Sequence, residues 1–205
     1  MKKIILASGS PRRKELLSMM GLDFTVVPSG YEEDMTLKLA PKKLAAVLSL
    51  GKAMEVAKRE NGIIIAADTF VSYGGAVIGK PKDKAHAQQM LKMLSGKIHS
   101  VFTGVTIIDT HNSKIITKVE ETKLTFKKIS AVEIDWYVNS GDRLGLAGAY
   151  AVQDIGSIFV KRIEGDFFNV MGLPLRLLAE LLKKFNIDIF ALKTKTKSLE
   201  FKSLS

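Results

Sequence analysis

The residues best suited to chemistry lie near the start of the chain, between Ser8 and Arg13. Ser10 suits the N-cap of a helix, and Pro11 suits its first position because proline has a fixed φ and needs no N–H partner there. A helix N-terminus offers unpaired N–H groups and the positive end of the helix dipole. Arg12 and Arg13 add guanidinium groups, each of which can donate two parallel hydrogen bonds to two oxygens of a phosphate. The segment predicts a phosphate-binding turn, and the alternative is a capped surface helix with solvated arginines.

Carboxylates that could serve as a base or bind a metal come from two further places. Asp68 follows the apolar run 63–67, which is typical of a fully buried strand, and it is predicted at the carboxyl end of that strand, where open α/β sheets place ligands. Glu33 lies among three adjacent acids in the polar loop 28–40. Two carboxylates beside phosphates would form an oxygen-ligand Mg²⁺ site. The alternatives are an Asp68 that caps a turn and a Glu33 that is solvated.

Two lysines extend this set of charged residues. Lys80 lies between a glycine and a proline, in a rigid turn that could direct its ammonium at a phosphate, although such turns are also common on surfaces. Lys52 follows Gly51 in the middle of a predicted long helix, where a lysine usually faces solvent.

Other kinds of site are not supported by the sequence. There is no Walker motif, no Gly-x-Ser-x-Gly motif, and no metal-ligand spacing among His86, His99 and His111. Cations and carboxylates without a covalent nucleophile favour metal-assisted attack of water on a phosphoryl group, with a carboxylate orienting or deprotonating the water.

Composition limits the class of protein. The 205 residues are 46% hydrophobic, which allows one large core or two small lobes, and the absence of cysteine excludes disulfides and thiolate catalysis. The apolar start of the chain is too short for a signal peptide and no run reaches transmembrane length, so we expect a cytoplasmic protein without membrane contact. The net charge of +10 raises the possibility of nucleic-acid binding. Scattered lysines and only 7% aromatic residues instead favour a solvated basic surface and no stable nucleic-acid partner.

Hydrophobic patterns and turn signals predict alternating helices and strands. Predicted strands are 4–6, 24–27, 63–67, 99–109, 114–126, 150–152 and 157–161, with a hairpin at Gly74-Gly75; predicted helices begin at Pro11, Pro41, Asp83, Ser130 and Pro174. This order predicts an α/β fold with a mixed sheet and two lobes around one cleft.

Several motifs, taken together and in order, resemble the Maf family of nucleoside triphosphate pyrophosphatases over about residues 3–187. The motifs are Ser8-Gly9-Ser10-Pro11-Arg12-Arg13-Lys14-Glu15-Leu16-Leu17, Ala67-Asp68-Thr69, Gly79-Lys80-Pro81, Leu94-Ser95-Gly96 with His99, Ala147-Gly148-Ala149-Tyr150 with Gln153, and Val170-Met171-Gly172-Leu173-Pro174-Leu175.

The resemblance implies hydrolysis of a nucleoside triphosphate to the monophosphate and pyrophosphate with a divalent metal, Mg²⁺ or Mn²⁺. It also implies a fold like that of inosine-triphosphate pyrophosphatases, an elongated mixed sheet flanked by helices. We expect one domain with two lobes over residues 1–190 and a flexible Lys/Ser-rich tail over 191–205. A dimer is common in the family, but the sequence shows no self-complementary patch, so the oligomeric state stays open.

The resemblance also implies roles for single residues. Asp68 matches the proton acceptor and, with Glu33, the metal site. The positions that handle the triphosphate and metal match Ser8, Ser10, Arg13, Glu33, Lys52 and Lys80. The three positions that separate substrate classes are Arg12, Thr69 and Gln153, and this trio resembles the branch that hydrolyses dTTP and UTP. The amide of Gln153 offers a donor and an acceptor, which suits the O4/N3 edge of uracil or thymine.

Two other functions stay open at this point. One is a nucleotide-sensing regulatory protein without turnover, suggested by Gly145-Leu146, where the family usually has Asp-Lys, and by the Lys-rich tail. The other is a pyrophosphatase acting on purine nucleotides or 7-methyl-GTP. Asp154, where the family commonly has glycine, could add a ligand or face solvent.

Overall fold

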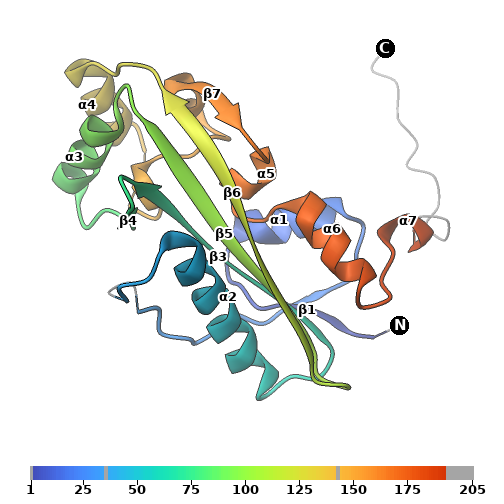
Figure 1. Cartoon of the computed structure of the whole chain (residues 1–205). Helices are drawn as coiled ribbons and strands as arrows, with labels where there is room; N and C mark the ends of the chain where they lie inside the picture. The colour runs from blue at the N-terminus through green and yellow to red at the C-terminus, as the bar shows by residue number, and fades with distance from the viewer. Residues whose placement is uncertain (1, 35–36, 142–143, 193–205) are drawn as a thin grey trace, which may run out of the picture.

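The computed structural model describes residues 2–34, 37–141 and 144–192, and its centre is one seven-stranded sheet. The strand order is β2-β1-β3-β5-β6-β7, with β4 paired to β3 off this path. The strands are β1 (Ile4–Leu6), β2 (Thr25–Val26), β3 (Ile63–Tyr73), β4 (Ala76–Ile78), β5 (Ile98–Asp109), β6 (Lys114–Phe126) and β7 (Val160–Glu164). The long strands β3, β5 and β6 run side by side along the length of the molecule (Figure 1).

The sheet is mixed, as the sequence predicted. β1 is parallel to β2 and β3, whereas the other neighbouring pairs are antiparallel. On the edge of β3 away from β5, β1 pairs as far as Ile65 and β4 begins at Val71. Among the described residues no strand pairs with this edge between those two points. The sheet therefore has a gap at the middle of β3, where Asp68 and Thr69 lie.

Helices cover both faces of the sheet. They are α1 (Pro11–Met19), α2 (Pro41–Ala57), α3 (Lys84–Leu94), α4 (Ala131–Asn139), α5 (Phe167–Met171), α6 (Leu175–Lys183) and α7 (Ile189–Leu192). Ile63 and Ile65 share an apolar cluster with α1 and α6, whereas Ile64 and Ala66 share one with α2. Because side chains alternate along a strand, Asp68 is directed to the α2 side and Thr69 to the α1 side.

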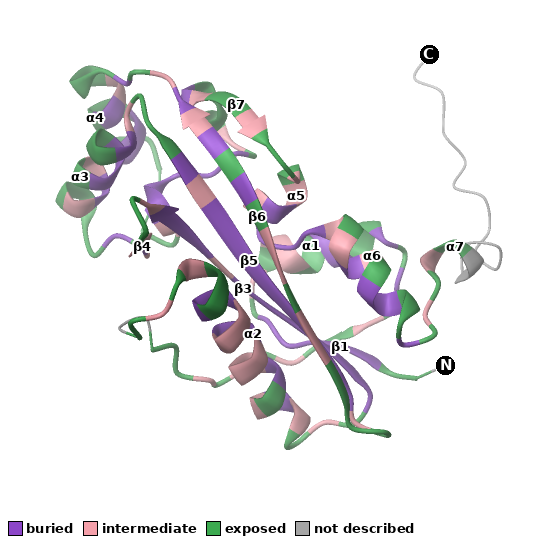
Figure 2. Ribbon diagram, in the orientation of Figure 1, coloured by how far each residue is buried: buried purple, intermediate pink, exposed green. Residues whose placement is uncertain are grey.

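The apolar residues form separate clusters toward the two ends of the sheet. One surrounds α3 and α4 and includes Phe126, Tyr137 and Phe159, and the others lie against α1, α2 and α6. Figure 2 shows buried segments of β3 and β5 joining these regions. The predicted two lobes correspond to these regions, which share a continuous sheet.

The position of Asp68 corrects one prediction. The sequence placed it at the carboxyl end of a strand, but β3 continues to Tyr73 before the Gly74-Gly75 turn. Both of those glycines have positive φ, which the predicted two-residue hairpin needs. Asp68 nevertheless lies beside the gap in the sheet, because the neighbouring strand β1 ends at Leu6, beside Ile65.

The segment after Tyr150 corrects two further predictions. The strand expected at 150–152 is absent: Tyr150, Ala151 and Val152 are buried without strand pairing. The strand expected at 157–161 is replaced in part by the 3₁₀ helix η2 (Ile155–Phe159), and β7 begins only at Val160. The cause is local, since the Asp154 carboxylate accepts a hydrogen bond from Gly156 N at 2.7 Å and caps η2. Asp154 therefore has a structural role as the cap of η2.

Most other elements match their predicted ranges. The capping box that begins α4 is present, with Ser130 and Glu133 each bonded to the other's backbone. The short helix α5 was not predicted. α7 extends to Leu192, so it enters the segment predicted as a tail, and residues 193–205 lie outside the described residues. None of the helices in the described part of the chain has the length and apolar character that crossing a membrane requires.

Candidate functional site

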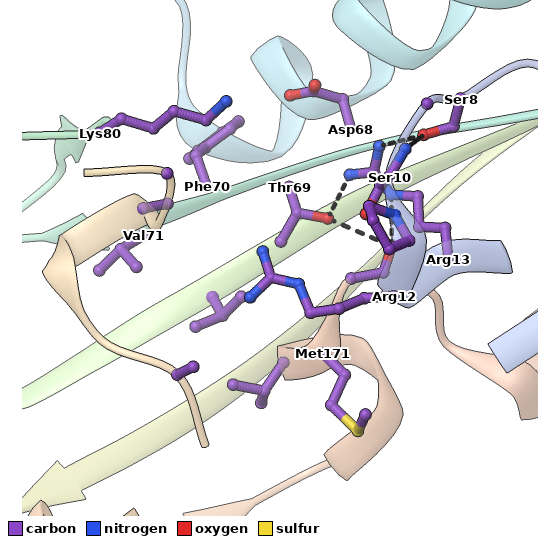
Figure 3. Close-up of a pocket in the computed structure, with 18 of the residues that line it drawn as sticks. Ser8, Ser10, Arg12, Arg13, Asp68, Thr69, Phe70, Val71, Lys80 and Met171 are labelled. Atoms are coloured by element: carbon purple, nitrogen blue, oxygen red, sulfur yellow. Dashed lines mark hydrogen bonds between the residues drawn. The ribbon is translucent and has the colours of Figure 1, made fainter. Parts of the chain in front are cut away.

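A cavity of about 630 Å³ lies at the gap in the sheet. Its walls come from the β1–α1 turn, α2, β3, the loop after β4, the segment 145–153 and the end of α5. Every residue selected from the sequence as a site residue lines it: Ser8, Ser10, Arg12, Arg13, Glu33, Lys52, Asp68, Thr69, Lys80 and Gln153. Figure 3 shows most of these side chains converging on one space.

The first wall is the turn that leads from β1 into α1. Ser10 occupies the N-cap position and Pro11 follows it, but the Ser10 hydroxyl makes no capping bond. Instead, Ser8 Oγ accepts from Ser10 N at 3.3 Å and from an Arg13 terminal nitrogen at 3.2 Å. Because the first N–H groups of a helix have no partner within it, this wall offers backbone donors as well as guanidinium groups.

Arg13 is held by neutral acceptors only. Its Nε donates to the Gly172 carbonyl at 2.9 Å, and a terminal nitrogen donates to Thr69 Oγ1 at 3.0 Å. Among the ion pairs of the described residues none involves Arg13. Burial lowers the pKa of this guanidinium, and the charges of Asp68 and Glu33 oppose that effect. A cation that is half-buried without a paired carboxylate is costly, so this wall is suited to an anionic ligand.

Lys52 lies between the two carboxylates of the site. Its ammonium forms an ion pair with Glu33 Oε1 at 2.6 Å and a second with Asp68 Oδ1. Only 12% of the Lys52 side chain and 5% of the Asp68 side chain are exposed. The interpretation of Lys52 as a solvent-facing helical lysine is therefore wrong.

The missing side chain at Gly51 leaves room for the loop that carries Glu33 to pack against α2. A Cβ at this position would overlap the ring of Tyr31, which belongs to the same loop as Glu33. Glycine costs about 1 kcal/mol in a helix interior, so its presence in the middle of α2 needs a local reason. The reason is the aromatic ring packed against the helix. Gly51 was a signal for this contact that sequence reasoning did not use.

The other wall combines one cation with apolar side chains. The Gly79 carbonyl accepts from Gly148 N at 3.0 Å, which joins the turn carrying Lys80 to the segment before Tyr150. Figure 3 shows Lys80 directed toward the side of the pocket that holds Asp68. The apolar lining, to which the sequence analysis gave no role, is Phe70, Val71, Val101, Ala147, Tyr150, Ala151, Val152, Val170 and Met171. Gln153 is exposed in the turn after Val152.

His99 supports the apolar wall from behind. Its Nε2 lies 2.8 Å from the Tyr150 hydroxyl, and both residues are buried. Burial lowers the pKa of His99 to about 4 and raises that of Tyr150. Both groups are thus neutral near pH 7.

The sequence also matches a known protein family. The family model described as Maf-like protein matches residues 3–185. The chain belongs to the Maf family. A relative from Bacillus anthracis named dTTP/UTP pyrophosphatase is 47% identical over 190 residues, which cover 92% of this chain and 98% of that protein. A relative from Thermoanaerobacter sp. with the same name is 48% identical over 184 residues, which cover 89% of this chain and 96% of that protein.

Among solved structures, a HAM1 protein from Coxiella burnetii is similar to this Maf chain with a TM-score of 0.49 and 15% identity. The alignment covers 90% of this chain and all of that one.

Asp68 and Glu33 are the residues of the Maf pocket that could hold a divalent metal. Their carboxylates converge on the one ammonium of Lys52, so both are directed at a single cationic position. In the described residues there is no cluster of three or more acidic or histidine side chains that could hold a metal alone. Mg²⁺ is commonly bound by one or two carboxylates together with substrate phosphates. The donors therefore fit a metal whose coordination is completed by a bound polyphosphate.

Proposed function

We propose that this Maf protein hydrolyses dTTP and UTP to the nucleoside monophosphate and pyrophosphate. The observation that carries the proposal is Arg13, a half-buried cation whose hydrogen-bond partners are all neutral, at the N-terminus of α1. Such a group needs an anion to balance it, and a polyphosphate brings several negative charges. The relatives named dTTP/UTP pyrophosphatase support the choice of substrate.

The phosphates would bind along the wall formed by the β1–α1 turn. Ser8, Ser10 and the start of α1 supply hydroxyl and N–H donors, and Arg13 supplies the guanidinium. Lys80 approaches from the opposite wall. Donors fixed in place before the reaction stabilise charge that develops on phosphate oxygens, and one such donor contributes about 3 kcal/mol in the transition state.

Asp68 would act as the base that orients and deprotonates the attacking water. Its carboxylate is buried at the gap in the sheet, where it pairs with the Lys52 ammonium. Asp68 and Glu33 would hold Mg²⁺ or Mn²⁺, which when bound neutralises phosphate charge and promotes ionisation of water. Lys52 would then shift toward the phosphates, because it shares its present position with those carboxylates.

The base would lie against the apolar wall, with Arg12 and Gln153 setting the choice of nucleotide. Tyr150 and Met171 offer apolar surface for a ring. The exposed amide of Gln153 can donate to O4 and accept from N3–H of uracil or thymine. Further parts of the proposal are a cytoplasmic location, a homodimer, and no stable nucleic-acid or membrane partner.

A nucleotide panel tests the proposal. The purified chain is incubated with Mg²⁺ or Mn²⁺ and each of UTP, dTTP, CTP, ATP, GTP, ITP and 7-methyl-GTP, and pyrophosphate and orthophosphate are measured separately. The expected result is pyrophosphate release, fastest with UTP and dTTP. Binding without turnover would instead support the nucleotide-sensing alternative, and a preference for ITP or 7-methyl-GTP would support the purine alternative.

A further inference from the structure

We propose that Thr69, Thr103 and Asn169 are positioning residues that fix the Arg13 guanidinium in the pocket. Thr69 would thus act at the phosphate end of the substrate, through Arg13, and not by contact with the base. The proposal rests on the proposed function for the identity of the anion that Arg13 binds. It concerns hydrogen bonds that begin at Arg13 and end in the buried backbone of α5.

The direction of these hydrogen bonds follows from the available protons. Thr103 Oγ1 lies 3.0 Å from the Asn169 carbonyl, and a carbonyl only accepts, so Thr103 donates there. A hydroxyl has one hydrogen, so in the 2.9 Å contact between Thr69 and Thr103 the donor is Thr69. Thr69 Oγ1 then accepts from Arg13 at 3.0 Å. Arg13 therefore donates to Thr69, Thr69 to Thr103, and Thr103 to the main-chain carbonyl of Asn169. We call this chain of hydrogen bonds the relay.

Asn169 is the anchor of this relay. It is fully buried, and its Nδ2 donates to the Val101 carbonyl and to Thr122 Oγ1, both at 3.0 Å. The main-chain carbonyl of Asn169 accepts hydrogen bonds from Gly172 N and from the Thr103 hydroxyl. Gly172 in turn accepts from Arg13 Nε through its own carbonyl. Asn169 thus supports the guanidinium in two ways, through Thr103 and Thr69 and through Gly172.

This arrangement has two consequences for substrate binding. Gly172, Ser8 and Thr69 occupy three of the five N–H groups of Arg13, which leaves two donors for phosphate oxygens in a fixed plane. The hydrogen of Thr69 is directed at Thr103 at 2.9 Å, with the Gly172 carbonyl as a longer second acceptor at 3.4 Å, so this hydroxyl has none to donate to a base. A substitution at position 69 is therefore expected to weaken phosphate binding and not recognition of the base.

A purely structural role predicts a different outcome, and Thr106 supplies the matched control. It lies on β5 like Thr103, it is equally buried, and its hydroxyl contacts Ser49 at 3.0 Å and Thr117 at 2.8 Å. None of those partners lines the pocket. If buried threonines only stabilise the sheet, Thr103→Val and Thr106→Val will behave alike.

The experiment measures kcat and KM for UTP and dTTP, together with calorimetric binding of inorganic triphosphate, in Thr103→Val, Thr103→Ser, Thr69→Val and Thr106→Val. Losing a hydrogen bond that orients a charged group is expected to lower kcat/KM about tenfold or more, equally for both nucleotides. Triphosphate binding is expected to weaken by about the same factor in Thr103→Val and Thr69→Val. Thr103→Ser, which keeps the hydroxyl, is expected to restore both readouts, and Thr106→Val to leave them unchanged.

Several results would overturn the relay. One is an equal loss in Thr106→Val; another is a Thr69→Val protein that loses nucleotide turnover but binds inorganic triphosphate normally, since that would mean contact with the base. If Thr103→Val does not fold, Thr69→Val at the partly exposed end of the relay gives the decisive comparison. A native chain that hydrolyses no nucleotide would contradict the proposed function, while triphosphate binding by the variants would still decide the relay.

Discussion

The ammonium of Lys52 and the carboxylate of Asp68 form an ion pair that links α2 to the middle of β3 across 16 residues of sequence. The pair lies at the gap that β1 and β4 leave in the sheet. Both side chains are largely buried, so a lysine from a long helix and an aspartate from a central strand serve one pocket.

Replacing Asp68 by Asn should abolish pyrophosphate release while leaving the fold intact. The amide keeps the shape of the carboxylate but cannot accept a proton, and loss of a general base lowers the rate by about 10²- to 10⁴-fold. Pyrophosphate release and thermal unfolding are measured side by side. The control is Asp109→Asn, at a buried carboxylate on β5 that pairs with Lys2 outside the pocket. Native activity in Asp68→Asn would remove Asp68 from the role of base.

Arg13→Met should separate stability from binding. An apolar side chain of similar length removes the desolvation cost of the half-buried cation, so the free energy of unfolding is expected to stay within about 1 kcal/mol of native. Inorganic pyrophosphate should raise the unfolding temperature of the native protein but not of Arg13→Met, because a ligand stabilises only a state that binds it. Lys14→Met, one residue further along α1, is the control and should still respond to pyrophosphate. A full response in Arg13→Met would contradict its place in the phosphate site.

Gly51→Ala should weaken the response to metal although alanine is the better helix former. The added Cβ overlaps the Tyr31 ring and displaces it, which removes packing that supports the loop carrying Glu33. We expect the Mg²⁺ concentration for half-maximal activity to rise about tenfold, as for loss of support behind a metal ligand. Gly30→Ala is the control, since a Cβ there has open space in the same loop. An unchanged metal requirement in Gly51→Ala would show that Glu33 does not depend on this packing.

His99 should make stability fall as the solution is acidified. Its folded-state pKa of about 4 lies below the ordinary 6.5, so the unfolded chain takes up the proton first. The resulting loss begins near pH 6.5, is complete near pH 4, and reaches about 3 kcal/mol. Denaturant unfolding of the native protein and of His99→Gln is compared across this range.

The difference in unfolding free energy between these two proteins isolates the histidine, because Glu55 and Glu133, whose pKa values are lowered to about 2, contribute equally to both. His111→Gln, at an exposed histidine, should keep the native pH dependence. Parallel pH profiles for the native protein and His99→Gln would contradict the prediction.

Gln153→Ala should reduce selection of the base and leave phosphate binding intact. Losing a neutral hydrogen-bonding group from a binding site is expected to lower kcat/KM for UTP by roughly tenfold. Binding of inorganic triphosphate should not change, since Gln153 comes from the segment 145–153 of the pocket wall and not from the β1–α1 turn. Gln88→Ala on α3, whose amide bonds Asp135 outside the pocket, is the control. Equal losses for UTP and inorganic triphosphate would mean that Gln153 acts on the phosphates.

Local features of the sequence predicted the elements that local forces decide. The Gly74-Gly75 hairpin, the Ser130 capping box and the Pro11 helix start each depend on a few adjacent residues, and the structure contains all three. The strand predicted at 150–152 was wrong because apolar composition alone does not separate a buried strand from a buried turn. The Asp154 cap, two residues later, is the local signal that was missed.

The sequence by itself determined which residue types are available for phosphate chemistry and where helices and strands carry them. Only the tertiary structure decided their partners. Arg13 and the Gly172 carbonyl are 159 residues apart in the chain, and Lys52 reaches Asp68 because α2 packs on one face of β3. The physical reason is that a helix cap or turn is a free-energy minimum of a short segment. The placement of a buried charge depends on which distant groups the whole sheet brings within hydrogen-bond distance.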